Sequence, residues 1–209
     1  RDVQNMPARL RWLGTWSGLY VRDIPAILRR SWLACLVVVV GLVSSAFIGY
    51  TYAVHYPLSS EMLGLEHISA ETFTETPAMD WLLTFTVWGV LSNNVRALLL
   101  AALLAVFSFG TLAVTLLMAP LAIVFFFVTQ VARAGYDPVL FFAASVLPHG
   151  LLELPVAVIA TALAVRLGAT FMSPPRGTTL SEGWLWALAD FVKVFIAVVL
   201  PLLALAAAM

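Results

Sequence analysis

The sequence predicts an all-α protein, a polytopic transmembrane helical bundle of about five spans with an N-terminal amphipathic interfacial helix. Three observations support this fold class. The 209 residues are 62% hydrophobic and only 11% charged, whereas soluble domains are about 45–50% apolar and about 25% charged. Several uncharged runs are long enough to cross a bilayer. The apolar residues lack the alternation that is typical of membrane-spanning strands. We therefore expect a multi-pass protein of the cell membrane.

Residues 1–30 form a basic segment ahead of the first span. This segment contains six arginines, and apolar side chains such as Trp16, Ile24 and Ile27 recur between them at roughly helical spacing. The pattern predicts an amphipathic helix on the membrane surface, with Pro25 as a bend. A plain basic flank beside the membrane is the alternative. In either case we expect the N-terminus to be cytoplasmic.

Residues 31–209 are expected to form the transmembrane bundle. The longest uncharged stretch, residues 97–132, would make about 54 Å of helix, which is too long for one ordinary span. Gly110 and Pro120 offer positions for a turn, and we divide this stretch between two spans. The predicted spans are 31–54, 94–114, 117–133, 139–167 and 184–209.

The connecting segments predict an orientation. Residues 55–80 form a loop with five carboxylate side chains and neither lysine nor arginine, which favours the extracytoplasmic side. With five spans, Arg166 and Arg176 lie on the cytoplasmic side with the basic segment, and the C-terminus lies outside. Fusing the second and third spans would move both arginines outside and weaken the bias of positive charge.

The stretch SVLPHGLLELP, residues 145–155, places ionisable side chains inside an apolar span. His149 and Glu153 are four residues apart, which puts them on one helical face and within reach of each other. A carboxylate at this depth costs several kcal/mol unless it is protonated, paired or hydrated. Pro148 and Pro155 each remove a backbone donor and tend to kink a helix.

The last span carries candidate partners for this pair. Asp190 and Lys193 are three residues apart on one helical face. Counted from the cytoplasmic ends, Lys193 lies about 15 Å deep and Glu153 about 20 Å deep. We therefore predict a buried polar cluster of His149, Glu153, Asp190 and Lys193, with a contact between Glu153 and Lys193. Asn93, Asn94 and Gln130 are further candidates for its neighbourhood.

This predicted cluster has two interpretations. It fixes helix register and packing, as buried polar groups do in membranes, or it moves protons or binds a substrate. Evidence for an enzyme is weak, because the His149–Glu153 spacing does not match the H-E-x-x-H motif and the chain has neither a G-x-S-x-G nor a P-loop motif. A single His–Glu pair supplies too few ligands for zinc. The sequence thus predicts no catalytic residue, no metal and no cofactor.

A row of small side chains on the first span has two possible uses. Gly41, Ser45 and Gly49 repeat at intervals of four residues, which allows close approach of another helix. The row either mediates dimerisation or packs within the bundle, and we favour the second.

Two stretches of the chain carry motifs that resemble those of the stage II sporulation protein M family. NNVRALLLAALLAVFSFGTL, residues 93–112, contains an N-N-x-R motif and an F-G pair, and LPHGLLELP, residues 147–155, contains P-H-G-x-x-E-L, with RLG following at 166–168. The matching residues are Asn93, Asn94, Arg96, Phe109, Gly110, Pro148, His149, Gly150, Glu153 and Leu154. The resemblance covers roughly residues 85–209, and less specifically the first span.

This resemblance implies a multi-pass helical protein of bacteria or archaea. The sporulation member of the family is a membrane scaffold that holds peptidoglycan-degrading partners during engulfment of the forespore. We therefore expect a non-enzymatic scaffold or accessory subunit of the cell envelope, whose partners are the lipid bilayer and other membrane proteins or copies of itself, and not nucleic acid. The alternatives are a transporter or channel component that uses the His149/Glu153 site, and an intramembrane hydrolase.

Overall fold

The computed structural model describes residues 18–59, 87–175 and 177–208, with the backbone alone at Val87, Ser145, Pro148 and His149. These ranges are almost entirely helical and contain no strand. The elements are η3 (Leu19–Asp23), α2 (Ile24–Arg30), α3 (Trp32–His55), α5 (Val87–Phe107), α6 (Thr111–Arg133), α7 (Pro138–Ser145), α8 (Leu147–Ala169), α9 (Leu180–Val194), η5 (Phe195–Val199) and α10 (Leu200–Ala207). Residues 1–17 of the basic segment and 60–80 of the acidic loop lie outside the described ranges.

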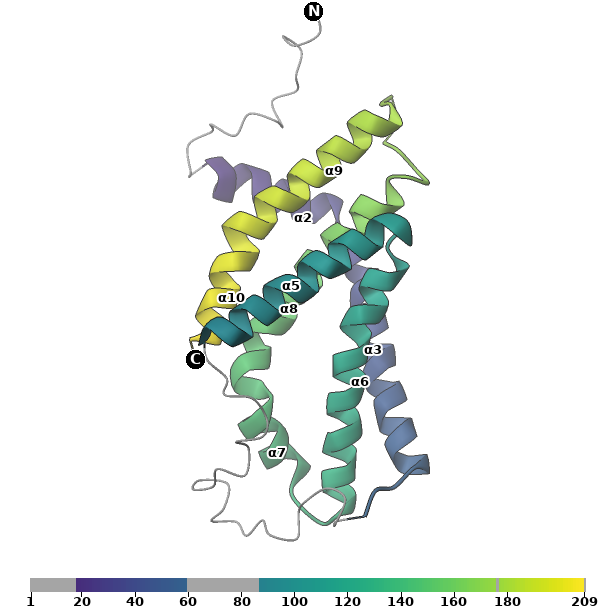
Figure 1. The fold of residues 1–209 in the computed structure, drawn as a ribbon, viewed down its shortest axis with the longest axis vertical. Helices are drawn as coiled ribbons and strands as arrows, with labels where there is room; N and C mark the ends of the chain where they lie inside the picture. The colour runs from purple at the N-terminus through teal and green to yellow at the C-terminus, as the bar shows by residue number, and fades with distance from the viewer. Residues whose placement is uncertain (1–17, 60–86, 176, 209) are drawn as a thin grey trace, which may run out of the picture.

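Five helical stretches of the described chain are long and apolar enough to cross a membrane, which confirms the predicted all-α polytopic bundle. They are Trp32–His55, Trp88–Phe107, Thr111–Arg133, Gly150–Ala169 and Leu180–Ala207. The last stretch runs through α9, η5 and α10 without interruption (Figure 1).

The second and third spans are separated at a different position from the predicted one. We predicted a boundary between residues 114 and 117, but α5 ends at Phe107 and α6 begins at Thr111. Gly110 forms this turn with a φ of 97°, a left-handed conformation that costs glycine little, and its amide donates to the carbonyl of Ala105. Pro120 is accommodated inside α6.

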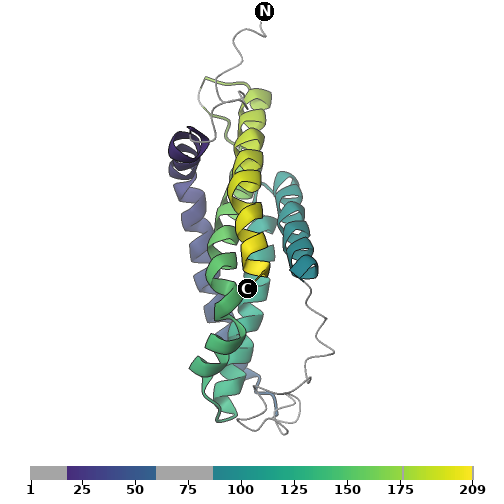
Figure 2. The same cartoon turned by 90° about the vertical axis from the view of Figure 1, so that its left-hand side faces the viewer.

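α3 and α6 run side by side along most of their length (Figures 1 and 2). The row of small residues on α3 makes this contact. Ser45 donates to the carbonyl of Met118, and a Cβ atom on Gly49 would overlap the carbonyl of Ala122. The row therefore packs within the bundle, as we favoured from the sequence.

α8 lies at the centre of the fold and contacts α3, α5, α6, α9 and α10. Its buried side chains include Val156, Ala160 and Leu163, which belong to the main hydrophobic core. α5 crosses α8 obliquely (Figure 1). Near the end of α8, Gly168 approaches the backbone of Ala105 and Gly110 so closely that a Cβ atom would overlap both.

The predicted fourth span, 139–167, consists of two helices. α7 begins at Pro138, where the Asp137 side chain accepts from the amides of Val139 and Leu140 and so caps the helix. Val146 separates α7 from α8, and Pro148 lies in the first turn of α8, where a proline costs no helical hydrogen bond. Pro155 lies inside α8, as predicted.

The described part of the basic segment lies across one end of the bundle. α2 runs sideways in Figure 1 and is seen end-on in Figure 2, at right angles to the long axis. Ile24 and Ile27 are buried in the main core, whereas Arg22, Arg29 and Arg30 are exposed. This arrangement is that of an amphipathic helix with its apolar face on the bundle and its basic face outward.

Candidate functional site

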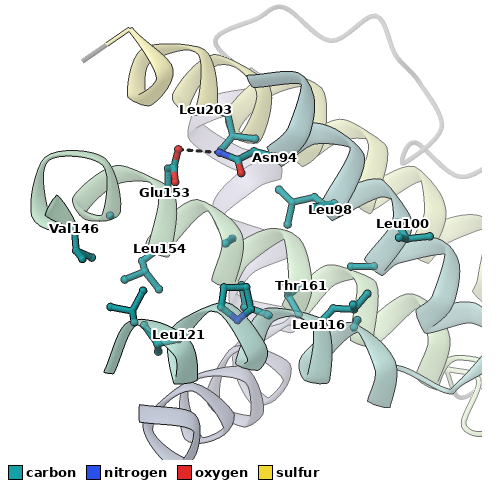
Figure 3. A pocket seen from close by; sticks show the side chains of 18 residues that line it. Asn94, Leu98, Leu100, Leu116, Leu121, Val146, Glu153, Leu154, Thr161 and Leu203 are labelled. Atoms are coloured by element: carbon teal, nitrogen blue, oxygen red, sulfur yellow. Dashed lines mark hydrogen bonds between the residues drawn. The ribbon is translucent and has the colours of Figure 1, made fainter. Parts of the chain in front are cut away.

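Asn94 and Glu153 form a hydrogen bond between two crossing helices. The side-chain amide of Asn94, on α5, donates to Glu153 Oε1, on α8, over 2.8 Å (Figure 3). Both side chains are half-buried. The amide donor replaces water that a membrane interior does not provide.

A cavity of about 340 Å³ lies beside this hydrogen bond, between α5, α6, α8 and α10. Its wall is mostly Ala, Leu and Val side chains, and its polar members are Asn94, Glu153 and Thr161 (Figure 3). Leu100 and Leu116 also line the cavity and are 49% and 40% exposed on the outer surface. The cavity therefore reaches the apolar exterior of the bundle.

Thr161 has a buried hydroxyl group that lacks a hydrogen-bond partner among the described residues. Only 1% of this residue is exposed, and it lines the cavity. Threonines in helices usually donate to the carbonyl four residues earlier, as Thr129 does to Phe125 and Thr170 does to Arg166. A buried hydroxyl without a partner is costly, which makes Thr161 an unusual wall residue.

Asp190 belongs to a second polar contact near the opposite end of α8. The guanidinium group of Arg166 forms an ion pair of 2.9 Å with the buried Asp190 and also donates to the hydroxyl of Ser31 over 3.2 Å. These residues lie on α8, on α9 and between α2 and α3. The contact therefore fastens three parts of the chain together at one end of the bundle.

Lys193 and Asp23 lie beside that contact. Their charged groups are 3.9 Å apart, and Lys193 is buried. One turn further along, Tyr20 donates to the carbonyl of Ala197 over 2.8 Å. Because Pro201 lacks an amide hydrogen, it cannot donate to this carbonyl four residues earlier, and the Tyr20 hydroxyl takes that role.

The four residues of the predicted polar cluster lie at two levels of the bundle. Arg166, the partner of Asp190, is thirteen residues from Glu153 along α8, or about 20 Å. Leu203, near the end of α10, lines the cavity with Glu153 (Figure 3), and Asp190, earlier in the last span, pairs with Arg166, so α8 and the last span run antiparallel. The predicted Glu153–Lys193 contact would have to span about 15 Å of helix, and this register does not favour it.

The reason for this difference is a helix offset. The predicted depths of Lys193 and Glu153 assume that the fourth and fifth spans end at one level, but α9 begins beyond the end of α8 (Figure 1).

The His149 side chain lies outside the described part of the structure, so its contact with Glu153 stays a prediction. Its neighbour Gly150 lines the cavity.

The other sequence candidates have different positions. Asn94 lies beside Glu153 as suggested, whereas Asn93 is exposed. Gln130 is buried at the far end of α6, where it donates to the carbonyls of Ala53 and Tyr56 and accepts from the amide of Leu58. It therefore fastens the end of α3 and is not part of the cavity.

The sequence did not identify several residues of these contacts, among them Arg166 and Thr161. In the sequence Arg166 marks the cytoplasmic side and belongs to the RLG match, but no partner is predicted for it, although an arginine so close to the end of an apolar span signals a need for a carboxylate partner. The sequence around Thr161 gives no indication that its hydroxyl group lacks a partner.

Among the described residues, no group of three or more His, Cys, Asp or Glu side chains is placed to hold a metal ion.

Comparison with known proteins identifies one family. The family model of stage II sporulation protein M matches residues 32–209, which include every motif residue named above and all five membrane-spanning stretches. No curated protein and no solved structure matches the chain. In this fold the Asn94–Glu153 hydrogen bond joins the N-N-x-R motif to the P-H-G-x-x-E-L motif.

Proposed function

The chain belongs to the stage II sporulation protein M family, and on that premise we propose that it is a non-enzymatic membrane scaffold or accessory subunit that organises partner proteins in the cell envelope. The partner is a membrane protein that presents an acidic side chain to α5. The observation that carries this proposal is the position of Arg96.

Arg96 is an exposed arginine near the middle of a membrane-spanning stretch, Trp88–Phe107. It follows Asn94 by two residues, a rotation of about 200° around the helix, so Asn94 contacts Glu153 while Arg96 faces outward. Large apolar side chains surround it on the outer face of α5, including Trp88, Leu99 and Leu103. Within the described residues Arg96 forms no ion pair.

A charge in this position is costly in a bilayer. Charged side chains in membrane-spanning helices almost always face the bundle interior or pair with another group. Arg96 does neither within the described chain, and Asn93, three residues earlier, adds a second exposed polar group on the same face. An acidic side chain on a neighbouring membrane protein would satisfy both groups.

The basic segment supports the same function from the end of the bundle. The core side chains Ile24 and Ile27, the Tyr20–Ala197 hydrogen bond and the Lys193–Asp23 pair hold η3 and α2 in place. Three outward arginines then form a fixed basic surface for anionic lipid or an acidic partner. We place this end, the N-terminus and Arg166 in the cytoplasm, and the C-terminus outside, from the distribution of positive charge.

Two carboxylate contacts support the non-enzymatic character that we propose. Glu153 contacts Asn94, and Asp190 contacts Arg166, so these carboxylates join helices to one another. A general base has to lie within hydrogen-bond reach of a reacting group. Contacts between helices are the use that polar groups commonly have in membrane bundles.

The test is co-purification from native membranes with Arg96→Gln beside Arg133→Gln, which removes an exposed arginine from the end of α6. We expect a stoichiometric membrane protein with the wild type and with Arg133→Gln, and its loss with Arg96→Gln. Cross-linking then locates the acidic partner residue, and exchanging the two charges restores the complex. A second, differently tagged copy in the purified complex would identify the partner as the chain itself. Equal co-purification with Arg96→Gln and the wild type would overturn the proposal.

A further inference from the structure

We propose that the cavity between α5, α6, α8 and α10 binds a single-chain aliphatic alcohol, with its hydroxyl group between Thr161 and the carbonyl of Leu116 and its hydrocarbon chain along the apolar wall. This inference goes beyond the scaffold function and does not rest on it. It rests on the volume of the cavity, on the composition of its wall, and on one hydrogen-bond donor and one acceptor in that wall.

The size and the wall of the cavity favour hydrocarbon. A volume of about 340 Å³ is far more than the roughly 10–15 Å³ that one water molecule needs, and it is in the range of sites for small organic ligands, about 300–1,000 Å³. Eighteen residues line the cavity, and apart from Asn94, Glu153 and Thr161 they are apolar or glycine. Buried water needs several polar partners for each molecule, so this wall does not hold a water-filled space. Most of the ligand is therefore apolar.

Thr161 supplies a hydrogen-bond donor. Only 1% of this residue is exposed, and its hydroxyl group has no partner among the described residues. A helical threonine usually donates to the carbonyl four residues earlier, but Thr161 does not donate to Ala157. Because Thr161 lines the cavity, a ligand oxygen that accepts from it would remove the cost of a buried unpaired group.

α6 supplies a hydrogen-bond acceptor. Pro120 has no amide hydrogen, so the carbonyl of Leu116 lacks its usual helical donor. Leu116 and Pro120 are four residues apart, on one stripe of α6, and both line the cavity. The carbonyl between them therefore lies on the cavity side of the helix, where a donor on the ligand would reach it.

The donor and the acceptor lie at a similar depth in the bundle. α6 and α8 run antiparallel (Figure 1), and a Cβ atom on Gly110, directly before α6, would meet the backbone of Val165. From this contact Leu116 is six residues along α6 and Thr161 is four residues back along α8. These separations correspond to about 9 Å and about 6 Å of helix. One ligand group that both accepts and donates can therefore serve both residues.

A hydroxyl group has these two properties and charged head groups do not. A hydroxyl accepts and donates, whereas a carboxylate has no hydrogen to donate to the carbonyl of Leu116 and an ammonium group has no lone pair to accept from Thr161. Leu100 and Leu116 line the cavity and are exposed on the apolar exterior. A neutral alcohol therefore enters sideways from the bilayer, where its hydrocarbon chain concentrates.

The test is photo-cross-linking in proteoliposomes with three diazirine probes that share one decyl chain. Decanol donates and accepts, its methyl ether only accepts, and decane does neither. Peptide mapping compares labelling of the cavity wall at Leu98 and Ala157 with labelling of Val43 and Phe47, which are exposed on α3. Labelling at α3 reports the bulk lipid phase and corrects for how much of each probe enters the membrane.

After this correction we expect the ether to label the wild-type cavity about fivefold more than decane, and decanol about fivefold more than the ether, since each step adds one hydrogen bond. Thr161→Val should reduce labelling by the ether to that of decane. Pro120→Ala should reduce labelling by decanol to that of the ether, because the new amide donates to Leu116. Thr115→Val is the control and should behave as the wild type, because the Thr115 hydroxyl is exposed and bonds to Thr111 of its own helix.

Three outcomes would overturn the proposal. The first is equal labelling of the cavity by all three probes in the wild type, as expected if water satisfies the two polar groups. The second is an order of labelling that Thr161→Val and Pro120→Ala both leave unchanged. The third is competition by unlabelled dioctanoylglycerol as strong as that by decanol, which would contradict a single-chain ligand. Ala157→Phe, which fills the cavity, should abolish labelling there by every probe, and Thr161→Val keeps the side-chain shape, so the test holds even if Ala157→Phe fails to fold.

Discussion

Asn94 donates a hydrogen bond of 2.8 Å to Glu153 across fifty-nine residues of sequence. This bond fixes the crossing of α5 over α8 at the inner end of the cavity. It also determines the direction of Arg96, because a helix that turns Asn94 inward turns a residue two positions later outward. One contact between motif residues thus defines both an interior site and an exterior surface.

Replacing Asn94 by Ala should lower the free energy of unfolding by about 1–2 kcal/mol, because the carboxylate of Glu153 loses its amide donor. Glu153→Gln should cost less, since a neutral amide oxygen still accepts from Asn94. A double-mutant cycle, measured by denaturant titration in mixed micelles, should show coupling between the two positions. Asn93→Ala, at an exposed residue, is the control, and an equal loss of stability there would contradict this assignment.

Gly168→Ala should destabilise the protein by about 1–3 kcal/mol, because the new methyl group meets the backbone of Ala105 and Gly110, which cannot move aside. Gly150→Ala is the matched change on the same helix. Its Cβ would meet only ordinary contacts, the nearest being Val146 Cγ1 at 3.5 Å, and alanine favours a helix over glycine by about 1 kcal/mol. Thermal unfolding of the two variants in detergent should therefore shift in opposite directions.

Gln130→Leu should loosen the end of α3 selectively. The substitution leaves the carbonyl of Tyr56 and the amide of Leu58 without their buried partner, at a cost of about 1–3 kcal/mol. Hydrogen exchange should accelerate in residues 53–58 and stay unchanged in α8. Thr129→Val is the control, because the Thr129 hydroxyl bonds only to Phe125 on its own helix. Identical exchange in the two variants would refute this role of Gln130.

The sequence predicted the class of fold and the number of spans because these depend on composition and on the length of apolar runs. It misplaced the turn between the second and third spans, since an uncharged run provides no marker of register. Both Gly110 and Pro120 suit a turn by their local chemistry. The choice between them depends on tertiary contact, because the turn at Gly110 packs against Val165 near the end of α8.

The site was predictable in part for a similar reason. The depth of Glu153 predicts that it needs a partner, and Asn94 is among the neighbours that the sequence suggests. The pairing of Asp190 with Arg166 was not foreseen, because it depends on how far α9 extends beyond α8. Helix spacing specifies which residues share a face of one helix, but the offset between two helices is set by their packing.

The Tyr20–Ala197 hydrogen bond joins residues 177 positions apart, near the two ends of the described chain. During synthesis the tyrosine leaves the ribosome long before its acceptor exists, so this hydrogen bond forms only after the last helix has been made. A chain that stops short of α9 would lack both this hydrogen bond and the Lys193–Asp23 pair, which help to hold the outward arginines in place. The basic surface of Arg22, Arg29 and Arg30 therefore reaches its fixed position only in a chain that has been synthesised through its last helix. A partner that binds this surface in its fixed position would bind complete chains and not truncated ones.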